Sequence, residues 1–254
     1  MSQEDATIAI DFSLAFFDLQ LRFAERVAHI CSLSFEEGLL TFTNLYLQFI
    51  DRSFDPAHPI WQEYLEGLQK AQDPAKWTCI FYQTRREDSV SSHPEGCFRY
   101  VYLAQEKTLR LHFAANNDSS GYGPLSKVRI SARLQELRAL FVEVKRQHPD
   151  ALVVRGNSWL YNIDAYKRLF PPQYTKTMRI VDEEFQYLSL WGQFVRRNGQ
   201  VREDIASSFL SDLCKQDTLE GLKRCFPYQV MGLEYPITYF YEFYEYSSPP
   251  ESYI

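Results

Sequence analysis

The sequence predicts an α+β protein in which an N-terminal helical region precedes a mixed central sheet. Apolar residues recur at helical spacing before residue 75, whereas short runs rich in β-branched and aromatic residues follow Trp77. A long amphipathic stretch at residues 126–147 separates two of these runs. With 254 residues, 45% of them hydrophobic, the chain can bury one large core or two modest ones.

The N-terminal helical region is expected to contain at least three helices. An apolar stripe from Phe16 to Ile30 predicts the first, and the short link CSLS leads into the second. Ser34 and Glu37 have the spacing of a capping box, so the second helix should begin near Ser34 and continue to Phe49. We expect these two helices to form a hairpin. A third should follow Pro59, because proline suits the first turn of a helix.

Three runs after residue 76 predict an antiparallel meander. They are WTCIFYQTR, CFRYVYLAQ and TLRLHFAA, with SSHPEG and EK as the turns between them. Side chains alternate between the two faces of a strand. In the third run, Leu109 and Leu111 should therefore point to the core while Arg110 and His112 point away from it.

A parallel β-α-β unit should follow the meander. Strand 108–115, helix 126–147 and strand 151–155 would form it, with a right-handed crossover. Later strands are expected at TKTMRIV and PITYFYEFYEY, with helices near EEFQYLSLWGQF and REDIASSFLSDLCK between them. We therefore divide the chain into a helical region, residues 1–75, packed on an α+β domain, residues 76–254.

The segment DSSGYG and the start of the long helix suggest an anion site. A strand that leads through a glycine-containing turn into a helix presents free backbone N–H groups, and the helix dipole there favours an anion. Lys127, Arg129 and Arg133 oppose this dipole, so their placement is explained if an anion binds. The alternative is that these cations are simply solvated and the loop only turns a corner.

This order of elements resembles the GNAT acyltransferase superfamily over about residues 77–182. The family has a meander strand, a pyrophosphate loop of the form [QR]xxGx[GA], a long helix, a splayed strand, a short helix carrying a tyrosine, and a further strand. The counterparts here are DSSGYG, the helix from Ser126, ALVVRG and NIDAYKRLFPPQY. NSWLYN and LWGQF also resemble stretches of a bacterial protein group. The resemblance implies a GNAT-like domain and an acyl-CoA-dependent N-acyltransferase whose acceptor the sequence leaves open.

The resemblance also implies roles for individual residues. The backbone of Gly121, Tyr122 and Gly123 would hold the pyrophosphate of an acyl-CoA, and Tyr166 would protonate the departing thiolate. The start of the helix would add Ser126, Lys127 and Arg129 to the cofactor-binding set. Acyl transfer also needs a base for the acceptor amine, and His112 is the best placed by strand alternation.

A competing interpretation is a non-catalytic binding or interaction module on the same scaffold. A dinucleotide fingerprint at residues 121–126 fits less well, because an antiparallel meander does not suit a Rossmann domain. Ser158 lacks the GxSxG elbow of a hydrolase, and its neighbours suggest a helix start.

Composition limits the classes of partner that the protein is expected to bind. A net charge of −6 argues against a nucleic-acid-binding protein. The five cysteines form no CxxC pair, so we expect neither a metal site nor a disulfide framework. No apolar run approaches the roughly 18 residues that span a bilayer, and the acidic N-terminus does not resemble a signal peptide. We expect a cytoplasmic protein that acts on a small molecule, in an oligomeric state that the sequence leaves open.

Overall fold

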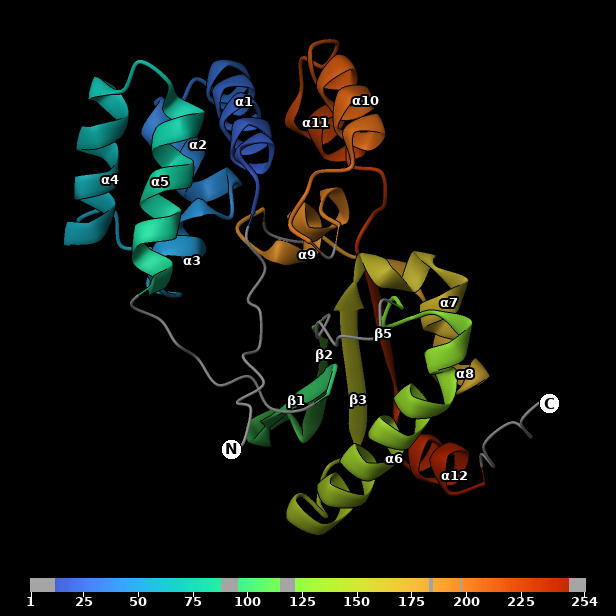
Figure 1. The fold of residues 1–254 in the computed structure, drawn as a ribbon. Helices are drawn as coiled ribbons and strands as arrows, with labels where there is room; N and C mark the ends of the chain where they lie inside the picture. The colour runs from blue at the N-terminus through green and yellow to red at the C-terminus, as the bar shows by residue number, and fades with distance from the viewer. Residues whose placement is uncertain (1–11, 88–95, 115–121, 183–184, 197, 247–254) are drawn as a thin grey trace, which may run out of the picture. The chain divides into compact units, whose positions relative to one another are not determined.

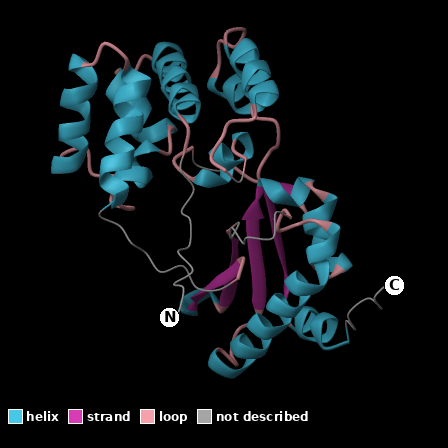
Figure 2. Ribbon diagram, in the orientation of Figure 1, coloured by secondary structure: helices cyan, strands magenta, loops and turns pink. Residues whose placement is uncertain are grey.

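The computed structural model describes residues 12–87, 96–114, 122–182, 185–196 and 198–246. The chain forms two compact units that are each discontinuous in sequence. Of the described residues, 96–114, 122–182 and 230–246 belong to the sheet unit, and 12–87, 185–196 and 198–229 belong to the helical unit. Each unit is made of separate stretches of the chain, whereas the sequence predicted a single boundary after residue 75. Figures 1 and 2 show the helices and strands of each unit.

The sheet unit contains a mixed five-stranded sheet with the order β1-β2-β3-β5-β4. β2 runs parallel to β3, and the other neighbouring strands are antiparallel. The α+β class and the β-α-β unit are thus confirmed, because α6 connects β2 to β3. The strands are β1 (Phe98–Leu103), β2 (Thr108–Phe113), β3 (Val153–Ser158), β4 (Arg179–Ile180) and β5 (Met231–Pro236).

One face of the sheet forms the core of this unit. Leu109, Leu111, Val154 and Leu233 are all buried on it, and the strand register places them in adjacent positions. Helix α6 lies across the sheet, as Figure 1 shows, and Phe141 of α6 stacks on Phe240 of α12 with ring centroids 5.1 Å apart. The helices are α6 (Ile130–Gln147), α7 (Asp164–Lys167), α8 (Pro172–Thr175) and α12 (Thr238–Tyr246), with 3-10 helices at Ala104–Glu106, Lys127–Arg129 and Trp159–Asn162.

The helical unit packs around buried aromatic rings. Phe23 of α1 is fully buried and lies 5.3 Å from Trp191 and 5.8 Å from Phe209 between ring centroids. The capping box of Ser34 and Glu37 at the start of α2 is confirmed. The helices are α1 (Leu14–Cys31), α2 (Phe35–Phe42), α3 (Leu45–Phe49), α4 (Pro59–Lys70), α5 (Pro74–Glu87), α9 (Leu188–Trp191), α10 (Glu203–Leu213) and α11 (Leu219–Arg224).

The prediction of a first meander strand at WTCIFYQTR is wrong, because this segment lies in helix α5. Asp73 accepts a hydrogen bond from the backbone of Lys76, and Pro74 opens the helix, so the start signal lies just before the aromatic run. Phe81 and Tyr82 are buried while Ile80 is 48% exposed, which is a helical rather than an alternating pattern. The meander is reduced to the hairpin of β1 and β2.

A second aromatic run was also assigned incorrectly. PITYFYEFYEY forms helix α12, in which Phe240 and Tyr244 are buried four residues apart, and the strand is β5 just before it. The expected helix 35–49 is split into α2 and α3 at Thr43 and Asn44. β3 extends beyond the expected strand 151–155, to Ser158, and α6 begins at Ile130 after a 3-10 turn. Within the described ranges, no helix is long and apolar enough to cross a membrane.

Replacement of Gly67 by alanine tests the placement of α5. Alanine usually stabilises a helix interior by about 0.5–1 kcal/mol relative to glycine. In this fold a Cβ at Gly67 would lie 2.0 Å from Cζ2 of Trp77, whose Nε1 donates to the carbonyl of Tyr64. We expect Gly67→Ala to lower the free energy of unfolding by about 1–3 kcal/mol in urea denaturation.

The double variant Gly67→Ala/Trp77→Ala provides the control. Without the indole, alanine at position 67 should be neutral or stabilising relative to Trp77→Ala alone. A stabilising effect of Gly67→Ala in the wild-type background would contradict the helical packing of α4 on α5.

Candidate functional site

The parallel strands β2 and β3 separate at their carboxyl ends. Their ladder runs from Thr108–Val153 to Leu111–Gly156, although β2 continues to Phe113 and β3 to Ser158. Over these last two residues β2 stays paired with β1, and β3 stays paired with β5. The strand ends are therefore held by their outer neighbours and leave a gap in the backbone ladder between them. Ligands of open α/β sheets commonly bind at the carboxyl ends of strands.

The loop before α6 is partly described. Gly121 lies outside the described residues. Tyr122 is 58% exposed, and a Cβ at Gly123 would meet no atom within 4 Å. The backbone N–H of Ser126 donates to the carbonyl of Gly123 at 3.0 Å, and the N–H of Arg129 donates to the carbonyl of Ser126 at 3.0 Å. These two N–H groups serve the turn itself and are not free to bind an anion.

Side-chain groups remain at the start of α6. Lys127 is exposed, and the Oγ of Ser126 is buried without a hydrogen-bond partner. Arg168 donates to the carbonyl of Leu125 at 2.8 Å and so ties this loop to the segment after α7. An anion at this position would be bound mainly by side chains, and less by the backbone than the sequence suggested.

Tyr166 lies in the core of the sheet unit, only 2% exposed. Its ring stacks on Phe98 at 6.2 Å and meets Phe113 edge to face at 5.4 Å, measured between centroids. Its hydroxyl is hydrogen-bonded to Tyr161. Burial raises the pKa of Tyr166 well above the ordinary tyrosine value, so the hydroxyl keeps its proton and can act as a hydrogen-bond donor.

Tyr161 and Tyr174 extend this contact to the end of the β2–β3 ladder. Their hydroxyls are 2.8 Å apart, and a Cβ at Gly156 would lie 2.2 Å from the hydroxyl of Tyr161 and 2.4 Å from that of Tyr174. Burial also raises the pKa of Tyr161. Tyr166, Tyr161 and Tyr174 thus form a chain of protonated hydroxyls, the tyrosine chain, directly beneath the last paired residue of β3.

His112 lies on the opposite face of β2 from the tyrosine chain. Its neighbour Phe113 contacts Tyr166, and side chains alternate along a strand. His112 is in register with Arg99 of β1. The structure therefore does not bring the two predicted catalytic residues together on one face; both lie at the end of β2, where the ladder with β3 has stopped.

Gly156, Tyr161 and Tyr174 were not identified from the sequence. Their relation depends on a strand end, a 3-10 helix and a short α-helix that meet in space, and no fixed spacing encodes it. The interpretation of Ser158 as a helix start is confirmed, because its Oγ accepts from the N–H of Leu160 at 3.1 Å. None of the five cysteines forms a disulfide, and among the described residues no group of three or more His, Cys, Asp or Glu side chains could hold a metal ion.

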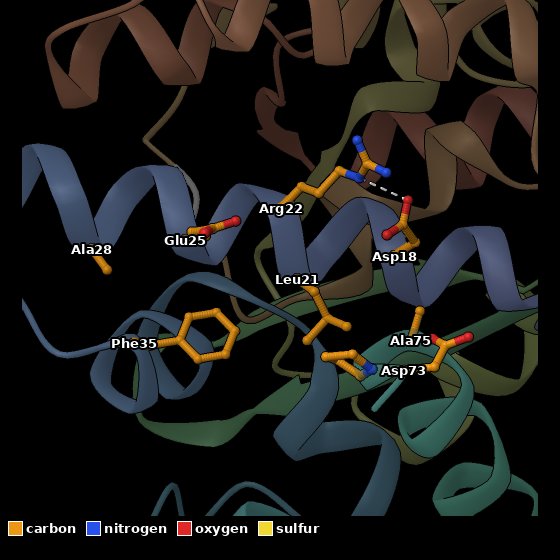
Figure 3. Close-up of a pocket in the computed structure, with 9 residues that line it drawn as sticks. Asp18, Leu21, Arg22, Glu25, Ala28, Phe35, Asp73 and Ala75 are labelled. Carbon is orange, nitrogen blue, oxygen red and sulfur yellow. Dashed lines mark hydrogen bonds and ion pairs between the residues drawn. The ribbon is translucent and has the colours of Figure 1, made fainter. Parts of the chain in front are cut away.

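A concave surface lies within the helical unit. This α1 groove, of about 550 Å³, is formed by one side of α1 and the starts of α2 and α5 (Figure 3). Asp18 and Arg22 form an ion pair at 2.9 Å, and Glu25 and Asp73 add two further carboxylates. Its lining residues are Asp18, Leu21, Arg22, Glu25, Ala28, Phe35, Asp73, Pro74 and Ala75. The lining lacks the histidines, cysteines and buried hydroxyls that would support acyl transfer.

Comparison of the chain with protein families, curated proteins and solved structures finds no match.

Replacement of Gly156 by alanine should disrupt the end of the β2–β3 ladder. The added methyl would overlap two buried hydroxyls, so we expect a loss of about 1–3 kcal/mol in the free energy of unfolding. Gly123→Ala is the matched control, since open space surrounds that position, and it should change stability by less than about 0.5 kcal/mol. Equal stabilities of the two variants in urea denaturation would contradict the close approach of the tyrosine hydroxyls.

The buried tyrosines also predict a loss of stability at alkaline pH. The pKa of Tyr161, Tyr166 and Tyr244 is raised by burial, so below a pH of about 10 both folded and unfolded states keep these protons. Above that pH the unfolded state releases protons that the folded state retains, and unfolding becomes more favourable by about 1.4 kcal/mol per pH unit for each such group.

Urea denaturation between pH 8 and pH 11 measures this effect. Tyr161→Phe should reduce the slope of stability against pH by about one proton relative to the wild-type protein. A slope that is the same in wild type and Tyr161→Phe would show that Tyr161 ionises without unfolding.

Proposed function

We propose that the sheet unit binds an acyl-CoA at the separated ends of β2 and β3 and transfers the acyl group to an amine. The observation that carries this proposal is the end of the parallel ladder at Leu111–Gly156 while both strands continue. The order of elements supports it: β2, a glycine-containing loop, the long helix α6, β3, a short helix with Tyr166, and further strands. This order follows the resemblance to GNAT acyltransferases.

The unpaired backbone at the strand ends suits an amide-containing ligand arm. The β2–β3 ladder does not include residues 112–113 of β2 or residues 157–158 of β3. The backbone groups of these residues that face the other strand can therefore bind amides of the pantetheine chain. The phosphates would lie at the start of α6 near Ser126, Lys127 and Arg129. A backbone N–H of β3 would polarise the thioester carbonyl.

The reaction requires a base and a hydrogen-bond donor to the leaving thiolate. The acceptor amine attacks the thioester carbon, the C–S bond breaks, the amine loses one proton to the base, and CoA leaves as a thiolate that takes its proton from solvent. His112 is the candidate base. The tyrosine chain is the candidate donor, with Tyr161 nearest to the strand ends and Tyr166 hydrogen-bonded behind it.

The candidate base and the candidate donor lie on opposite faces of the sheet, and a ligand bound between the two strands would be able to contact both. Because the backbone ladder has ended, an acyl group held there would be open to His112 from one face and to the tyrosine chain from the other. The raised pKa of Tyr161 and Tyr166 favours a hydrogen bond to the developing thiolate over complete proton transfer, since the hydroxyls hold their protons tightly.

Thermal unfolding with acetyl-CoA and longer acyl-CoAs tests the proposal. At about 100 times its dissociation constant a ligand adds roughly 2.7 kcal/mol to the stability of the folded state, which shifts the melting temperature by several degrees. Lys127→Gln should reduce the shift. Lys176→Gln, an exposed lysine after α8, removes the same charge and should preserve it.

Kinetics then test the chemical roles. His112→Gln and Tyr161→Phe should each slow single-turnover acyl transfer by about 10²–10⁴-fold without loss of acyl-CoA binding. A melting temperature that stays flat across the acyl-CoA series would refute the proposal.

The second candidate function is a non-catalytic binding module. The α1 groove favours it, because Leu21, Phe35 and Ala75 give the groove an apolar base while Glu25 and Asp73 border it with negative charge. Such a surface suits a peptide segment with one apolar and one basic side chain. Under this function the melting temperature does not respond to acyl-CoA, so the same experiment separates the two candidates.

A further inference from the structure

The sheet face that carries His112 is unusually rich in arginine. Arg99 of β1 lies in register with His112, and Arg110 of β2 lies in register with Arg155 of β3. Side chains at such positions are close neighbours, and like charges there repel one another. The strand residues of the apolar core belong to the other face. The repulsion between these arginines should therefore destabilise the sheet, and the packing of the apolar core gives no reason for their placement.

In the described part of the chain, Arg155 alone of these three arginines is bound by carboxylates. Arg155 donates from Nε to Glu234 at 2.8 Å and from an Nη to Glu106 at 2.6 Å, so two carboxylates hold it. Among the residues that the structure describes, neither Arg99 nor Arg110 has a carboxylate partner. Both side chains are half-buried, and the Nε of Arg99 is inaccessible to water and has no hydrogen-bond partner. Within the described ranges, these two partly desolvated guanidinium groups near His112 thus have no anion paired with them.

We propose that Arg99 and Arg110 bind the carboxylate of the acceptor, and that the acceptor class is amines that carry a carboxylate. This inference rests on the proposed acyl transfer at His112. Guanidinium groups bind carboxylates in a bidentate geometry with charge-assisted hydrogen bonds. Neighbouring strand positions are about 5 Å apart, so an amine at His112 and a carboxylate at the arginines would be separated by a few bonds. Amino acids and the N-terminal residues of acidic peptides have this arrangement.

Matched pairs of amines that differ only in a carboxylate provide the test. Phenylalanine and 2-phenylethylamine, glutamate and 4-aminobutyrate, and lysine and cadaverine are titrated into the full chain by calorimetry, without acyl-CoA. We expect the member with the additional carboxylate to bind at least about tenfold more tightly in at least one pair. Equal binding within every pair overturns the inference.

Variants assign the preference to the arginines. Arg110→Gln and Arg99→Gln should each abolish most of it, whereas Arg138→Gln, an exposed arginine of α6, should preserve it. Arg110→Lys keeps the charge but loses the planar fork and should retain an intermediate preference, which covers the case in which the glutamine variants do not fold. The melting temperature without ligand should not fall in Arg110→Gln, because an unpaired cation is removed; a purely structural arginine would lower it. Loss of the preference in Arg138→Gln to the same extent would overturn the assignment.

The outcome is distinguishable from failure of the proposed function. A carboxylate preference without any acyl-CoA binding refutes acyl transfer and leaves an anion site on this face. Acyl transfer with no difference within the amine pairs refutes the inference and leaves the proposed function in place.

Discussion

The parallel pairing of β2 with β3 is the constraint on which the sheet unit depends. Parallel neighbours need a crossover, and α6 supplies it with a stripe that buries Leu137, Phe141 and Val144 against the sheet. That stripe decides which face of every strand is apolar, because side chains alternate and the register links all five strands. The polar face, with His112 and Arg110, is therefore a consequence of how α6 packs on the opposite side.

The same pairing explains why the two strands separate at their carboxyl ends. β2 is held by β1 through Phe113, and β3 is held by β5 through Ser158, so the twist of the sheet can separate the two strands without loosening either. Close packing then limits which atoms can lie against the backbone of β3 at Gly156. Gly156 has no side chain, and the hydroxyls of Tyr161 and Tyr174 occupy the volume that a methyl group would need. Polar atoms thus reach the sheet backbone at the point where its ladder ends.

The sequence predicted the elements whose signals are local and missed those where composition and periodicity disagree. The capping box of Ser34, the stripe of α6 and the alternation of β2 all reappear in the structure. The segments 77–85 and 236–246 were assigned to strands because they are rich in aromatic residues, yet their buried positions recur every three or four residues. Aromatic composition is a weak guide in a chain with 16% aromatic residues, since its helices also pack through rings.

The candidate site was predictable only in part, for a related reason. His112 could be placed on a face by alternation within one strand, and Tyr166 by its position after β3. The tyrosine chain joins three elements, and its hydroxyls meet Gly156 only after those elements pack, so no spacing in the sequence encodes it.

Charge gives a further example of local structure overriding a global property. The net charge of −6 argues against a nucleic-acid-binding protein, but the residues of the sheet unit include 14 Lys and Arg and 14 Asp and Glu, so the acidic excess belongs to the helical unit. The sheet then sorts these charges by face. Glu106 and Glu234 both bind Arg155, which leaves the β1–β2 side of the same face with Arg99, Arg110 and His112. The electrostatic field at a bound ligand is set mainly by these neighbours, because salt at about 0.1 M screens exposed charges that are more than about 10 Å away. An acidic protein can therefore carry a local group of half-buried arginines on one face of its sheet.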